Sequence, residues 1–124
     1  MTLEPGARAE IKHTVDDDDT AIALRSGAVA VLGTPRVVAL CEEASVAAVD
    51  GQLPEGQTSV GMRIQLDHLQ PNAVGSTVAA EAVLDKVEGR RLTFTVSVRD
   101  QRGLVACGKV TRVVVDTDRF LEKA

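Results

Sequence analysis

The segment Thr34-Pro35-Arg36-Val37-Val38-Ala39-Leu40-Cys41-Glu42-Glu43-Ala44 decides how the rest of the sequence is interpreted. A Thr followed by Pro is typical of a helix start, with Thr34 as the N-cap and Pro35 at the first helical position. The helix is predicted to end near Asp50–Gly51, where glycine can adopt the left-handed conformation of a helix cap. Because the segment is almost wholly apolar, we expect this helix to be buried.

Glu42 is the odd residue of this helix. Arg36, Glu43 and Asp50 recur every seven residues and share one stripe, which we expect to face solvent. Glu42 lies about 100° away from that stripe, on a mostly apolar face. Burying a carboxylate there costs several kcal/mol unless it is paired or used. Glu42 is therefore a candidate functional residue, and the alternative is a structural pair with an arginine from the sheet.

Strand patterns dominate the remainder of the chain. Before the helix, residues 9–15 form a candidate edge strand, Asp16–Asp19 is expected to stay solvated, and residues 21–24 are expected to form short helical turns. After the helix, alternating apolar and polar residues predict four strands, near 59–69, 77–87, 92–99 and 104–116. One long helix followed by a four-strand antiparallel meander predicts an α+β fold, with a central helix wrapped by a curved sheet.

Composition excludes several classes of protein. The 124 residues are expected to form a single domain, residues 1–124. A net charge of −4 and an aromatic content of 2% argue against nucleic-acid binding. No membrane-spanning run or signal pattern is visible, so a cytoplasmic protein without a membrane partner is expected. Cys41 and Cys107 are predicted to be reduced thiols, and no metal-ligand spacing is present.

Three spacings and two short stretches of sequence together carry a family resemblance. Thr34 and Glu42 are eight residues apart, Gly61 and His68 are seven apart, and Gly75 follows seven beyond. The stretches Val87-Glu88-Gly89-Arg90-Arg91-Leu92 and Asp118-Arg119-Phe120 match a hairpin and a C-terminal tail. From about residue 30 onward, the chain resembles the fluoroacetyl-CoA thioesterase branch of the hotdog-fold superfamily.

The resemblance implies a hotdog fold and an acyl-CoA thioesterase that needs no cofactor. It implies a homodimer, or a dimer of dimers, in which the two sheets pair and acyl-CoA enters between subunits. Thr34, Glu42 and His68 would be the catalytic residues, and Gly61 would offer a backbone amide near the thioester carbonyl. Candidate contacts to the CoA phosphates are Arg90, Arg91 and Arg112.

Two departures from the family pattern keep alternatives open. No Phe precedes Thr34, where the fluoroacetate-specific enzyme has an aromatic lid, and Val110 stands where a His is expected. We predict hydrolysis of a small or medium acyl-CoA, with Glu42 as nucleophile or general base, His68 assisting, and Thr34 orienting the substrate or stabilising the oxyanion. The alternative is a non-catalytic module that binds acyl-thioesters. A hotdog hydratase is disfavoured because the helix carries no His.

Overall fold

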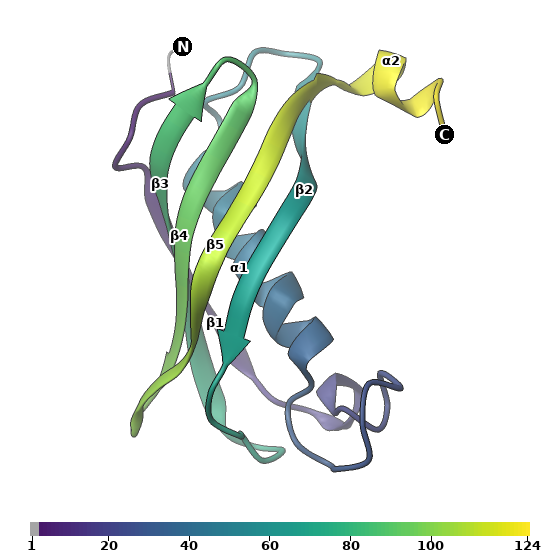
Figure 1. Cartoon of the computed structure of the whole chain (residues 1–124), viewed down its shortest axis with the longest axis vertical. Helices are drawn as coiled ribbons and strands as arrows, with labels where there is room; N and C mark the ends of the chain where they lie inside the picture. The colour runs from purple at the N-terminus through teal and green to yellow at the C-terminus, as the bar shows by residue number, and fades with distance from the viewer. Residues whose placement is uncertain (1–2) are drawn as a thin grey trace.

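The computed structural model describes residues 3–124. Its elements are β1 (Arg8–Thr14), the short 3-10 helix η1 (Asp17–Asp19), α1 (Thr34–Ala48), β2 (Gln57–His68), β3 (Thr77–Glu88), β4 (Arg91–Asp100), β5 (Gly103–Asp116) and α2 (Thr117–Leu121). The five strands form one antiparallel sheet that curves around α1 (Figure 1). This is the helix-and-sheet arrangement expected of a hotdog fold, and the predicted strands match the observed ones to within a few residues.

The order of the strands differs from the predicted meander. The sheet has the order β1-β3-β4-β5-β2, so β2 pairs with β5 and not with β3. Alternation identifies a strand and its buried face, but it does not identify the neighbouring strand. The connection through residues 69–76 carries the chain across the sheet instead of closing a hairpin. As a result, β1 and β2 are the two edge strands, which confirms the edge position predicted for β1.

The core lies between α1 and the concave face of the sheet. Ala80 and Ala82 on β3 are fully buried, and such small side chains let α1 pack close to the sheet. The buried residues of α1 are Val37, Leu40, Cys41, Ala44, Ser45 and Ala48. The helix ends with Val49 as its C-cap, and Gly51 two residues later has the expected left-handed conformation, with φ +74°. Within residues 3–124, no helix is long and apolar enough to cross a membrane.

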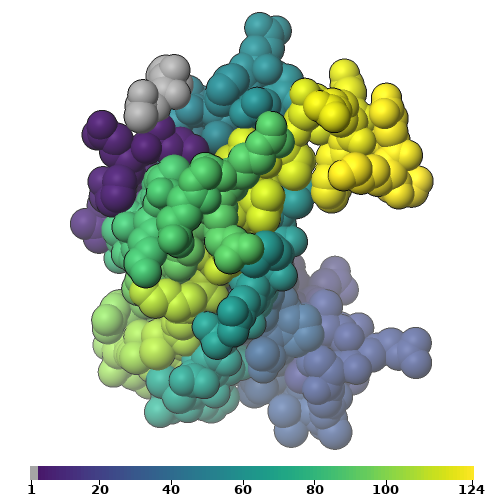
Figure 2. Space-filling model, turned by 45° about the horizontal axis from the view of Figure 1, so that its top comes forward, coloured from purple at the N-terminus to yellow at the C-terminus, as the bar shows by residue number. Residues whose placement is uncertain are grey.

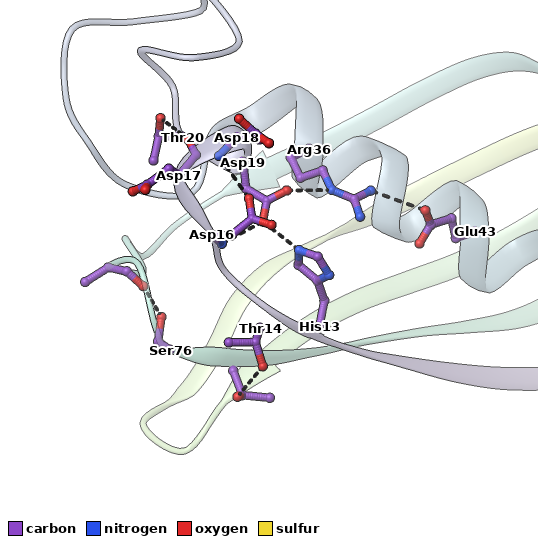
Figure 3. A network of polar contacts seen from close by, with 12 residues as sticks. His13, Thr14, Asp16, Asp17, Asp18, Asp19, Thr20, Arg36, Glu43 and Ser76 are labelled. Carbon is purple, nitrogen blue, oxygen red and sulfur yellow. Dashed lines mark hydrogen bonds and ion pairs between the residues drawn. The ribbon is translucent and has the colours of Figure 1, made fainter.

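One expectation for the N-terminal region is wrong. Asp19 is not solvated, because only 6% of its surface is exposed. His13 contacts the Asp19 carboxylate through Nε2 at 2.7 Å (Figure 3). Residues 21–24 form a hydrogen-bonded turn in which Leu24 N donates a helix-like hydrogen bond to Thr20 O, as expected of a short helical turn. Partners outside the acidic run account for the difference at Asp19, because His13 and the Arg36 guanidinium stabilise a carboxylate that neighbouring aspartates alone would repel.

Candidate active site

Thr34 and His68 form the first polar pair of the site. The Thr34 hydroxyl oxygen lies 2.8 Å from His68 Nδ1. The prediction of Thr34 as the helix N-cap is wrong, because Gly33 holds that position and makes no side-chain cap. Thr34 is instead the first residue of α1, and its hydroxyl meets the last residue of β2. A hydroxyl bonded to an imidazole can act as a nucleophile or as a proton-relay group.

Burial determines the charge of His68. It lowers the pKa of the imidazole below the ordinary value of 6.5, and the Gln70 backbone offsets only part of that shift. His68 is therefore neutral at pH 7 and can accept a proton. Its Nε2 atom is buried and has no hydrogen-bond partner within residues 3–124.

A cavity of about 350 Å³ lies beside Thr34 and His68. One side of it is formed by the segment between η1 and α1, through Ala21, Ser26, Gly27, Val29, Val31, Leu32 and Gly33. The segment following β2 contributes Leu69, Gln70 and Pro71. The Thr34 and His68 side chains therefore border a cavity that is large enough for a small acyl group.

Glu42 belongs to a second polar group, formed with Arg112 on β5. Arg112 Nη1 donates to Glu42 Oε2 at 3.0 Å. Arg112 also donates through Nε to Ser59 Oγ at 2.8 Å and through Nη2 to the Ser59 carbonyl at 2.9 Å. Burial lowers the pKa of Arg112, an effect that the Glu42 carboxylate partly offsets, and the guanidinium stays charged. Arg112 therefore fixes the position of the Glu42 carboxylate.

Glu42 is less buried than we expected from the apolar residues around it in the sequence. Its side chain is 34% exposed, against 9% for Arg112. Among the described residues, Arg112 contacts only Oε2, and Oε1 accepts no hydrogen bond. Glu42 and Arg112 line a cavity of about 550 Å³ whose other walls are Ala39, Glu43, Val46, Ala47 and Asp50. The carboxylate is held by an arginine and still faces open space.

Gly61 lies against the same carboxylate. A Cβ atom at this position would collide with Glu42 Oε2. The pairing of β2 with β5 shifts register between Gly61 and Arg63, and this bulge leaves Met62 48% exposed instead of on the buried face that alternation predicted. Glycine at position 61 thus allows the Glu42 carboxylate to approach the backbone of β2.

The structure brings the predicted catalytic residues together as two groups rather than as one triad. Thr34 and Glu42 are separated by about 12 Å along the helix axis, and each lines a different cavity. Within one chain, Thr34 meets His68, and Glu42 meets Arg112 and Gly61. A substrate must span both groups, or a second chain must bring them together.

The three arginines predicted to contact the CoA phosphates lie in different surroundings. Arg90 and Arg91 are exposed at the hairpin between β3 and β4. Arg90 also lines a groove of about 560 Å³ with Arg119 and Phe120 of α2 and with Lys123, which follows α2. Both arginines remain predictions as CoA contacts, whereas the guanidinium of Arg112 is occupied by Ser59 and Glu42.

Sequence reasoning did not identify Ser59 as a functional residue. It is 8% exposed, and both its hydroxyl and its carbonyl accept hydrogen bonds from Arg112. Arg112 could have indicated such a partner in the sequence, because it shares the buried face of β5 with Val110 and Val114. A charged residue in that position needs buried acceptors.

Val110 and Cys41 take no part in the site. Val110 is fully buried in the core. Burial, and then the nearby charge of Glu42, raises the pKa of the Cys41 thiol to about 12, so this thiol is not a nucleophile at neutral pH. Across residues 3–124, no cluster of His, Cys, Asp and Glu has the geometry of a metal site.

The chain is similar to known proteins in sequence and in fold. Residues 15–118 match the family model described as fluoroacetyl-CoA-specific thioesterase. The fluoroacetyl-CoA thioesterase of Streptantibioticus cattleyicolor is 36% identical over 93 residues, which are 75% of this chain and 67% of that protein. A variant of the fluoroacetyl-CoA-specific thioesterase FlK, crystallised with fluoroacetate and CoA, superposes with a TM-score of 0.89 at 31% identity, covering 95% of this chain and 99% of the other. A hot-dog-like protein from Thermanaerovibrio acidaminovorans superposes with a TM-score of 0.88 at 32% identity, covering 96% and 88%.

Proposed function

Because this chain belongs to the fluoroacetyl-CoA-specific thioesterase family, we propose that it hydrolyses a small or medium acyl-CoA thioester to the free acid and CoA. The family and the thioester hydrolase class predicted from the sequence are confirmed. The observation that carries the proposal is the set of polar groups on α1 and β2. A carboxylate beside a glycine and a hydroxyl bonded to a neutral imidazole each border a cavity.

These residues fit the requirements of thioester hydrolysis. The Glu42 carboxylate attacks the carbonyl carbon, or it takes a proton from a water molecule that attacks instead. If Glu42 attacks, the C–S bond breaks to leave an anhydride on Glu42, and a water molecule then cleaves this anhydride to release the free acid and restore the carboxylate. If water attacks, its oxygen bonds to the carbonyl carbon, Glu42 takes its proton, and the C–S bond breaks to give the acid directly. In both routes the CoA thiolate leaves as the thiol after taking up a proton that the water molecule supplies. The positive end of the α1 dipole at Thr34 favours the negative charge that develops on the carbonyl oxygen. His68 supplies or accepts protons through its hydrogen bond with Thr34.

A homodimer would unite the two groups of residues. Among the described strands, only β5 pairs with β2, so the outer edge of β2 is free. Antiparallel pairing of two β2 strands centred on Gln65 would place His68 opposite the partner's Gly61, because with Met62 bulged out of the ladder both residues lie three ladder positions from Gln65. Thr34 and His68 of one subunit would then lie beside the partner's Glu42.

The shape of the chain is compatible with this pairing. Figure 2 shows that α2 (yellow) and the segment between η1 and α1 (purple-blue) project from the same side of the molecule, with a hollow between them. A second copy related by two-fold symmetry would occupy that side. We therefore propose a homodimer as the smallest assembly that completes the site, while a dimer of dimers remains a sequence prediction.

The acyl group is proposed to be small or medium in size without selectivity for fluoroacetyl. The segment that walls the Thr34–His68 cavity carries Val29, Val31 and Leu32 and no aromatic residue. This segment therefore places no aromatic lid over the cavity.

Release of free thiol from a panel of acyl-CoA substrates tests the proposed function. We expect one thiol to appear for each acetyl-, butyryl- or hexanoyl-CoA consumed. The rival function, binding without catalysis, predicts that the same ligands raise the unfolding temperature while no thiol is released. Thermal stabilisation without thiol release would overturn the hydrolase assignment.

The pH dependence of kcat/KM is expected to follow His68. Because burial lowers its pKa below 6.5, the neutral imidazole persists into mildly acidic solution. Activity should therefore fall on acidification only below pH 6.5, as His68 becomes protonated. The check is a kcat/KM profile from neutral to acidic pH with a short acyl-CoA. A half-maximal point above 6.5 would contradict this role of His68.

Gly61→Ala is expected to lower kcat by about tenfold, because the new methyl group displaces the Glu42 carboxylate from its position. The fold should persist, since the clash involves the flexible end of a side chain. Met62→Ala, at the exposed neighbouring position in the same bulge, is the matched control and should keep the wild-type rate. Equal rates for the two variants, measured by steady-state kinetics, would show that Gly61 has no effect on Glu42.

A further inference from the structure

The Asp19 carboxylate is the centre of a buried polar network outside the site described above (Figure 3). Its Oδ2 atom accepts from the Asp16 amide at 2.8 Å and contacts His13 Nε2 at 2.7 Å. Its Oδ1 atom accepts from Arg36 Nε at 3.0 Å. Burial by itself would raise the pKa of Asp19, but these hydrogen bonds outweigh it, and the pKa lies below the ordinary value of 3.8. The carboxylate is ionised at neutral pH.

The network ties three parts of the chain to one point. His13 comes from β1, Arg36 from the first turn of α1, and Asp19 from η1. Arg36 also donates to Glu43, about two turns further along α1, at 3.3 Å. Asp19 thereby fixes the start of α1, where Thr34 lies, relative to the edge of the sheet.

Asp19 also joins the two ends of the segment 20–33, which forms one wall of the Thr34–His68 cavity. Its backbone carbonyl accepts from the Gly33 amide at 2.9 Å, one residue before Thr34. Next to this bond, Thr20 forms a bridge with Leu32, and Ala21 N donates to Val31 O at 2.9 Å. The segment 20–33, which walls the Thr34–His68 cavity, is therefore a loop whose two ends are joined at Asp19.

We propose that Asp19 is a positioning residue for the Thr34–His68 pair. Its carboxylate holds the base of the loop 20–33 and the first turn of α1 in one place, so that the Thr34 hydroxyl points to His68 and the cavity stays closed on that side. Asp19 touches neither substrate nor reacting atoms in this role. The inference depends on the proposed thioesterase function for its kinetic test but not for its spectroscopic test.

Asp19→Asn removes the charge while keeping the size of the side chain. We expect kcat for a short acyl-CoA to fall by about tenfold or more, with a smaller change in KM, because a misplaced catalytic group slows the chemical step. Asp18→Asn is the matched control, since Asp18 belongs to the same acidic run and is exposed. An equal loss of kcat in both variants would mean that the loss of one negative charge, and not the contacts of Asp19, causes the effect. That result would overturn the proposal.

A double-mutant cycle separates positioning from general stability. If Asp19 acts through Thr34, then Asp19→Asn should have little further effect on kcat in a Thr34→Ala background. If the fold-losses in kcat of the two single variants instead multiply in the double variant, the two residues act independently, and the proposal is contradicted. His13 provides a second variant in case Asp19→Asn folds poorly. His13→Gln keeps an N–H donor for Asp19 and should retain more activity than His13→Ala, and equal activities would also contradict it.

The spectroscopic test follows the pKa of His68 by NMR in the folded protein. In Asp19→Asn the loosened loop should admit water to the cavity, and the pKa of His68 should rise toward its ordinary value of 6.5. An unchanged titration of His68 would overturn the positioning role. If the wild-type protein releases no thiol from acyl-CoA, the proposed function fails, and this measurement still decides the inference.

Discussion

Glu42→Gln is expected to lower kcat for acyl-CoA hydrolysis by a factor of about 10² to 10⁴, the usual contribution of a positioned general base. The amide keeps an oxygen that can accept the hydrogen bond from Arg112. It can neither attack a carbonyl carbon nor accept a proton from water. Single-turnover measurements with a short acyl-CoA would separate this loss in the chemical step from any change in binding.

The choice of Gln and the control for this variant both follow from the contacts of Glu42. Removing the side chain altogether would leave the buried Arg112 guanidinium without its anionic partner, which is strongly destabilising. Glu43→Gln is the matched control, because Glu43 is the adjacent residue of α1, is exposed, and pairs with Arg36 alone among residues 3–124. Wild-type rates in Glu42→Gln, or equal losses in both variants, would remove Glu42 from the catalytic residues.

His68→Gln is expected to cause the second large loss, by a factor of about 10² or more in kcat. Glutamine fills a similar space and can hydrogen-bond Thr34, but it does not exchange protons as the neutral imidazole does. The acidic limb of the kcat/KM profile should disappear with the imidazole, because it reflects the titration of His68. A pH profile of the variant, recorded with the wild type in parallel, measures both effects.

Asp67→Asn is the control for His68. Asp67 precedes His68 on β2, and its side chain is on the opposite face of the sheet, where it is exposed. This variant should keep the wild-type rate and the wild-type pH profile. An acidic limb that persists in His68→Gln would mean that another group titrates, and the role assigned to His68 would be wrong.

The fold could be predicted from local patterns, except for the pairing of β2. The Thr-Pro start and the left-handed Gly51 limit α1, and the alternation in residues 92–99 and 104–116 identifies β4 and β5. The pairing of β2 with β5 is a non-local property. It depends on where the connection 69–76 leads the chain, and no alternation within a strand encodes that direction.

The site was partly predictable for a similar reason. Thr34, Glu42, Gly61 and His68 were recognisable because their spacing matches a family, and the structure places each of them beside another member of the set. The spacing could not show that they separate into two groups within one chain. Nor could the sequence reveal the buried state of Asp19, because a run of four aspartates is typical of a solvated surface and the partners His13 and Arg36 lie outside the run.

An obligate hybrid dimer tests the assembly of the site most directly. Chains carrying Glu42→Gln and chains carrying His68→Gln would be produced together with different affinity tags, and the hybrid would be purified through both tags. If Glu42 of one subunit works with Thr34 and His68 of the other, the hybrid contains one intact site and should recover about half of the wild-type rate. If each site is built within a single chain, both sites of the hybrid are defective. A hybrid as inactive as its two parents would therefore contradict the shared site.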